Sequence, residues 1–186
     1  MKRNLACLFV LLLPVFFTAC AAQQSATVEG FTFTAEEGYD FISAPLGSSK
    51  EEISEKLNCT LVSKAENYGG THDPDHDAYM TQEFDAVDIC GKKAGVEAVF
   101  DDGKLYDLSF VIRLEDGKEG EALYHETAES FKQTFGEPLK EQEQNGMVSA
   151  LWRHEDNTQL LIQIVPVGES AIIQVGVADI TLLSIE

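Results

Sequence analysis

Two runs of alternating apolar and polar residues, 95–100 and 105–114, flank the dipeptide Asp102-Gly103. A period of two predicts strands with one buried face, and Asp-Gly between two such runs is among the strongest short-range signals for a β-hairpin. Residues 147–183 carry three more apolar runs, separated by turn signals at "EDNT" and "GES". These three runs predict an antiparallel meander, so the fold has to contain an antiparallel sheet.

Two other stretches carry helix signals. Residues 45–58 contain a capping box formed by Ser49 and Glu52, which predicts a short helix. Residues 115–138 predict a longer helix, with an apolar stripe at offsets of 4, 3 and 4 residues and a Gly-Pro stop at its end. The stripe consists of Tyr124, Ala128, Phe131 and Phe135.

Each predicted helix precedes a group of strands, so the order helix then strands occurs twice, with a charged loop at 139–146 inside the second group. We therefore predict an α+β fold, an antiparallel sheet with helices packed on one face, arranged as two tandem helix–β-meander units. The domain is expected to cover residues 31–186, with halves 31–115 and 116–186.

The N-terminus combines the basic residues Lys2 and Arg3 with an apolar run at 5–17 that is too short to span a bilayer comfortably. The sequence "FTAC" then places small residues directly before Cys20. This stretch resembles a bacterial lipoprotein signal peptide, although the family usually has Leu where Phe17 stands. The resemblance implies that Cys20 is acylated and becomes the mature N-terminus. Cleavage by an ordinary signal peptidase near "ACAA" is the alternative.

On this interpretation residues 1–19 are removed and residues 20–30, which are small and polar, form a tether between the lipid and the domain. We expect the protein to lie in the cell envelope, outside the cytoplasm and anchored to a membrane through Cys20.

The chain has 13 basic and 32 acidic residues, a formal net charge of −19 at pH 7. A surface of this charge repels nucleic acid and anionic lipid headgroups, so we expect neither as a partner. The charge favours solubility, cations and basic proteins. Hydrophobic residues make up 44% of the chain, so we expect a folded domain and not an acidic disordered tail.

Two cysteines, Cys59 and Cys90, remain in the predicted domain. Outside the cytoplasm such a pair predicts a disulfide, which would stabilise the fold by roughly 3–4 kcal/mol through closure of a loop of about thirty residues. Two separate buried thiols are the alternative. No spacing of histidine and cysteine residues matches a zinc or thiol-catalysis motif.

The segment "THDPDHD" at 71–77 begins like a calcium loop, with aspartates at alternate positions. Ala78 stands where that motif needs Gly, and Phe84 stands where it needs Glu, so an EF-hand is excluded. Pro74 also argues against a helix that would bring the two histidines together. A solvated loop is the simpler interpretation, and a looser cation site is the alternative. Its candidate ligands are His72, Asp73, Asp75, His76 and Asp77.

The lipoprotein-like start, the turn into "SSKEEISEKL" and the "DGKLYDLSF" hairpin are together similar to small bacterial lipoproteins of the BamE (SmpA/OmlA) type. The tandem helix–meander layout also resembles the β-lactamase inhibitory protein fold. The likeness is one of pattern, and the first helix ends in "LNC" without the Gly-Pro stop of the second. The resemblance implies a fold and a tendency to bind proteins, and it assigns no functional residue.

These patterns together indicate a lipid-anchored protein-binding or structural accessory whose acidic loops steer a basic partner. Trp152, the sole tryptophan, is expected either in the core or as an exposed aromatic contact for the partner. Trp152 and Tyr106 mark the open face of the meander sheet as the expected binding surface. A cation- or small-ligand-binding lipoprotein using residues 71–77 is the alternative function. The chain lacks the usual nucleophile, phosphate-loop and dinucleotide motifs, so neither an enzyme nor a cofactor is predicted.

Overall fold

The computed structural model describes most of the predicted domain. The described residues are 25–28, 31–34, 38–41, 43–63, 77–83, 85–89, 92–155 and 157–181. The predicted signal peptide at 1–19 and the predicted anchor Cys20 lie outside them.

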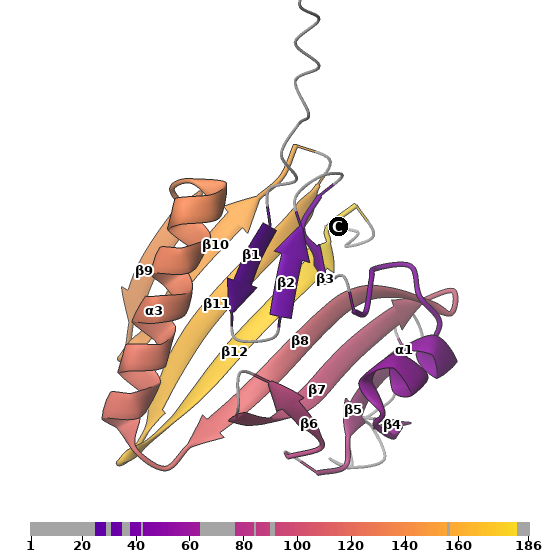
Figure 1. The fold of residues 1–186 in the computed structure, drawn as a ribbon, viewed down its shortest axis with the longest axis horizontal. Helices are drawn as coiled ribbons and strands as arrows, with labels where there is room; N and C mark the ends of the chain where they lie inside the picture. The colour runs from indigo at the N-terminus through magenta and orange to yellow at the C-terminus, as the bar shows by residue number, and fades with distance from the viewer. Residues whose placement is uncertain are drawn as a thin grey trace, which may run out of the picture.

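The described strands form one large antiparallel sheet and one small one (Figure 1). The large sheet has nine strands in the order β4-β5-β7-β8-β12-β11-β10-β9, with β6 paired to β7 beside β5. Its strands are β4 (Leu61–Ser63), β5 (Asp77–Thr81), β6 (Val87–Ile89), β7 (Lys92–Asp101), β8 (Lys104–Leu114), β9 (Lys140–Gln144), β10 (Met147–Arg153), β11 (Thr158–Val167) and β12 (Ser170–Asp179). The small sheet consists of β1 (Ser25–Val28), β2 (Phe31–Thr34) and β3 (Asp40–Phe41).

The predicted hairpins are confirmed. Asp101 pairs with Lys104, so Asp102 and Gly103 form a two-residue turn with φ values of 46° and 74°, as a type I′ turn requires. The meander of β10, β11 and β12 is confirmed as well. The predicted charged loop at 139–146 instead contains strand β9, which joins β10 through a second turn of this kind at Asn145-Gly146.

The prediction of an α+β fold with two tandem helix–meander units is wrong. The described part of the chain is mostly antiparallel β-sheet, with only two helices, α1 (Lys50–Leu57) and α3 (Gly117–Phe135). Strands β8 and β12 pair from Leu114–Ala171 to Asp107–Ala178, so both predicted halves contribute to a single sheet. The capping box of α1 is confirmed, but a helix of 8 residues that buries only Ile53 does not cover a sheet face.

Helix α3 and the small sheet lie side by side on one face of the large sheet (Figure 1). The helix packs against β11 and β12 and buries the predicted residues Tyr124, Ala128 and Phe131. The Phe131 and Trp152 rings pack edge to face, with their centroids 5.6 Å apart. Beside them, Phe41 of β3 meets Phe110 of β8 at 4.8 Å, so one core extends under both the helix and the small sheet.

A close approach of backbone fixes the start of α3 on the sheet. A Cβ atom built on Gly120 would lie 2.5 Å from the Cβ of Ala171, so only glycine fits at this position. The N–H of Gly117 also donates a 2.7 Å hydrogen bond to the carbonyl oxygen of Glu169, in the β11–β12 turn. These contacts hold the first turn of α3 against the ends of two strands.

Candidate functional site

The two aromatic residues predicted to mark a binding face are both buried. The side chain of Trp152 is 1% exposed, and its indole Nε1–H donates a 2.8 Å hydrogen bond to the carbonyl oxygen of Gly136 at the end of α3. Tyr106 is 5% exposed. Trp152 is therefore a core anchor, and a partner-binding surface has to lie elsewhere on the molecule.

The predicted disulfide is only half described. Cys59 lies just after α1 with a half-buried side chain, and burial raises the pKa of its thiol, which keeps the thiol protonated at neutral pH. Cys90 lies outside the described residues, directly after β6. The bridge between the two cysteines stays a prediction.

The predicted cation loop also falls outside the described residues, apart from its last member. His72, Asp73, Asp75 and His76 lie in the gap between β4 and β5, and Asp77 is the first residue of β5, paired with Phe100. Within the described ranges, no group of three or more His, Cys, Asp or Glu side chains is placed to hold a metal ion. Cation binding by the loop stays a prediction.

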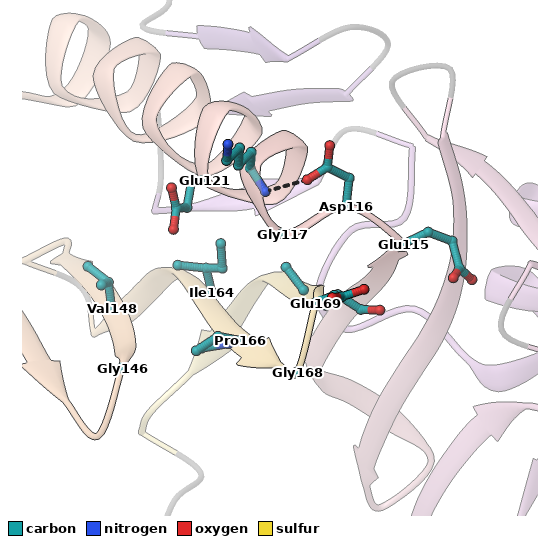
Figure 2. Close-up of a pocket in the computed structure, with 13 residues that line it drawn as sticks. Glu115, Asp116, Gly117, Glu121, Gly146, Val148, Ile164, Pro166, Gly168 and Glu169 are labelled. Atoms are coloured by element: carbon teal, nitrogen blue, oxygen red, sulfur yellow. Dashed lines mark hydrogen bonds between the residues drawn. The ribbon is translucent and has the colours of Figure 1, made fainter.

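A groove beside the start of α3 combines apolar and charged side chains. It has a volume of about 510 Å³ and lies between the first turns of α3 and the ends of β10, β11 and β12. Figure 2 shows Val148, Ile164 and Pro166 on the strand side and Glu121 on the helix side. We call this feature the α3 groove.

The apolar wall of the α3 groove follows from strand register. Val148 of β10 stands directly opposite Ile164 of β11, so both side chains project from the same face of the sheet. Pro166 extends the wall to the end of β11, where it is exposed. The Asn145-Gly146 turn reaches over to this proline, and a Cβ built on Gly146 would lie 3.1 Å from its Cγ. Val167, next in the chain, is 51% exposed.

Carboxylates surround the apolar wall. Glu121 projects from α3, Glu169 belongs to the β11–β12 turn, and Asp116 is the N-cap of α3, where its Oδ1 accepts a 2.8 Å hydrogen bond from the backbone N–H of Lys118. Among the described residues, no ion pair or side-chain hydrogen bond reaches the carboxylates of Glu121 and Glu169. Lys118 is the one basic residue among those that line the groove.

The groove continues along α3. A second cavity, of about 290 Å³, lies between the helix and the edge strand β9, and Val148 lines both cavities. It ends at Lys132, whose Nζ lies 2.8 Å from a carboxylate oxygen of Glu141 and so ties α3 to β9. The hydrogen bond to Glu141 raises the pKa of Lys132, and this cation is therefore already paired.

Comparisons with known proteins do not add to this picture. No family model matches the chain, and neither a curated protein nor a solved structure matches it. Within the part of the chain that the structure describes, neither helix is long and apolar enough to span a bilayer. Function is therefore inferred from the site and its chemistry.

Sequence patterns did not indicate the α3 groove, because its residues come from four separate elements. Glu121, Val148, Pro166 and Glu169 share no spacing in the chain, and the pairing of β10, β11 and β12 together with the packing of α3 on β12 brings them together. One available signal was overlooked. Asn145-Gly146 is a typical hairpin turn, and it would have predicted β9 and the turn that borders the groove.

Proposed function

We propose that this protein is a membrane-anchored extracytoplasmic lipoprotein that binds another protein as a structural or assembly accessory, and that the α3 groove receives the partner. The observation that carries the proposal is the apolar wall between α3 and the strand ends, where the exposed Pro166 and the half-buried Val148 lie beside the buried Ile164. Aliphatic surface of this kind gains free energy when a partner removes it from water.

The position of the groove relative to the predicted anchor supports this role. Figure 1 places the start of β1 at the upper end of the molecule and the β11–β12 turn at the lower end, beside the first turn of α3. Cys20 precedes Ser25 by five residues, which span at most about 18 Å when fully extended. On this proposal the anchor holds the β1 end near the membrane, and the first turn of α3, which borders the groove, lies towards the opposite end of the molecule (Figure 1).

Site-specific photo-crosslinking in intact cells tests the proposal. A crosslinking amino acid is placed at Lys118 and Glu169 on the groove, and at the exposed Glu55 of α1 as a matched control. We expect both groove positions to yield the same crosslinked protein and Glu55 to yield none of it. Identical products from all three positions, or no product from the groove, would contradict the proposal.

A further inference from the structure

We infer that the segment received by the α3 groove is a basic stretch of the partner protein, in which an aliphatic side chain is flanked by lysine or arginine. This inference rests on the proposed function and specifies the chemistry of the partner at the same site. The aliphatic side chain packs on the accessible part of the wall, Val148 and Pro166, and the flanking cations meet the carboxylates of Glu121 and Glu169.

The apolar wall and the two carboxylates are arranged for such a segment. Figure 2 shows Glu121 on the helix side of the wall and Glu169 at the β11–β12 turn, so the two carboxylates belong to different elements that line the same groove. Neither carboxylate has an ion pair among the described residues, so both are available to cations of a partner. A segment that carries one cation on each side of an aliphatic side chain brings opposite charge to both carboxylates and apolar surface to the wall.

An anionic occupant does not fit, although a helix begins at the groove. The N-terminus of a helix attracts anions through its unpaired N–H groups. Here the N–H of Gly117 is bonded to the Glu169 carbonyl oxygen, and the N–H of Lys118 is bonded to the Asp116 carboxylate. The first turn of α3 is thus already capped, and the carboxylates around it repel a further anion.

A second copy of this chain does not fit either. Its net charge of −19 would bring like charges together at the rim of the groove. The cavity that continues along α3 is lined by the further carboxylates Glu129, Glu141 and Glu143, and Lys132, which lines it too, is already paired with Glu129 and Glu141. The charge of the groove and of the whole molecule therefore selects a basic partner.

Nuclear magnetic resonance titration tests the inference, because it detects weak binding residue by residue. The ¹⁵N-labelled full-length protein in nonionic detergent micelles is titrated with three capped tripeptides, Lys-Leu-Lys, Lys-Ser-Lys and Glu-Leu-Glu. The backbone amides of Gly117, Gly146 and Gly168 report on the groove, and those of Gly47 and Gly103 report on distant turns. We expect Lys-Leu-Lys to shift the groove glycines selectively, Lys-Ser-Lys to bind more weakly, and Glu-Leu-Glu to leave them unchanged.

Charge-neutral variants separate specific pairing from general attraction. Glu121→Gln with Glu169→Gln should weaken the binding of Lys-Leu-Lys by roughly three- to ten-fold, as the loss of two exposed ion pairs allows. The matched control, Glu51→Gln with Glu55→Gln on α1, changes the net charge equally at an exposed site away from the groove and should weaken binding less than two-fold.

Three results would overturn the inference: no shift of the groove glycines with Lys-Leu-Lys, equal binding of Glu-Leu-Glu, or equal weakening by the two double variants. The crosslinking experiment is independent of these results. A partner crosslinked at the groove together with a failed titration would leave the proposed function in place and remove the basic segment. A successful titration without any crosslinked partner would keep the preference of the groove for a basic segment and remove the proposed function.

Discussion

At the scale of single residues, two side chains show how burial assigns a role that residue type leaves open. Trp152 was compatible with a surface anchor as well as with the core, and its 1% exposure and its bond to the Gly136 carbonyl oxygen place it in the core. Asp40 differs from Trp152, because an acidic residue in a strongly acidic chain is expected at the surface and yet this one forms hydrogen bonds within the fold. Its Oδ1 accepts hydrogen bonds from the N–H groups of Phe41 and Leu46, at 2.8 and 2.9 Å.

Asp40 gives a prediction about pH. Burial raises the pKa of its carboxyl above the ordinary value, against the opposing effect of the two backbone hydrogen bonds. Its protonated form is thus favoured by folding, so its contribution to stability is full below about pH 4 and is lost as the pH rises through the folded-state pKa. Asp40→Asn keeps the accepting oxygen and removes the charge.

We expect the free energy of unfolding of Asp40→Asn, minus that of the wild type, to rise with pH across this window and then level off. Urea unfolding at a series of pH values between 3 and 8 measures the difference. A difference that stays constant with pH would show that the carboxyl is not perturbed. Glu51→Gln, an exposed carboxyl on α1, serves as the control.

At the scale of elements, the local signals succeeded where a few neighbouring residues decide the structure. The Asp102-Gly103 turn, the Ser49–Glu52 capping box and the end of α3 at Gly136 are each confirmed. In all three, the conformation depends on positive φ or on hydrogen bonds within one turn, and both are set by adjacent residues. The placement of α3 on the sheet is different, because it depends on a contact with β12.

The contact between Gly120 and Ala171 predicts that a Gly→Ala substitution lowers the stability of the protein, which is the opposite of its usual effect in a helix. Gly→Ala inside a helix normally stabilises a protein by about 0.5–1 kcal/mol. Gly120→Ala should instead destabilise this protein by about 1–3 kcal/mol, because the new Cβ would lie 2.5 Å from the Cβ of Ala171 and force α3 off β12. Denaturant unfolding followed through the fluorescence of the buried Trp152 measures the change.

A double-mutant cycle isolates the contact. Adding Ala171→Gly removes the clash, so the double variant should be more stable than the sum of the two single changes predicts, by about 1 kcal/mol or more. Additive effects would mean that the helix start moves without cost. Lys118→Ala, an exposed change in the same turn, should alter the stability by less than about 0.5 kcal/mol.

At the scale of the whole molecule, the proposed anchor and the charge act together. A net charge of −19 disfavours attachment to an anionic membrane surface, so a protein of this kind needs a covalent lipid to stay there. We therefore predict that Cys20→Ala moves the protein from the membrane fraction to the soluble fraction. Fractionation and metabolic labelling with a fatty acid measure this, and retention of an unlabelled variant in the membrane would contradict the anchor.

The wrong fold class also belongs to this scale. The sequence suggested two helix–meander units because each helix signal precedes a group of strand signals, and this order is real. The pairing of β8 with β12 joins the two groups of strands into one sheet. The paired residues lie more than fifty positions apart, and no local sequence pattern in either strand predicts this pairing. The α3 groove arises from the same long-range pairing, together with the contact between Gly120 and Ala171.

The sequence by itself determined the hairpin turns, the helix caps, the alternation of buried and exposed strand positions and the acidic character of the molecule. These properties depend on backbone preferences and charges that act within a few residues. The tertiary structure alone decided that the strands form one sheet, that Trp152 is buried and that Glu121, Val148, Pro166 and Glu169 share a groove. Apolar burial has no direction, so it selects these long-range contacts only when the whole chain packs.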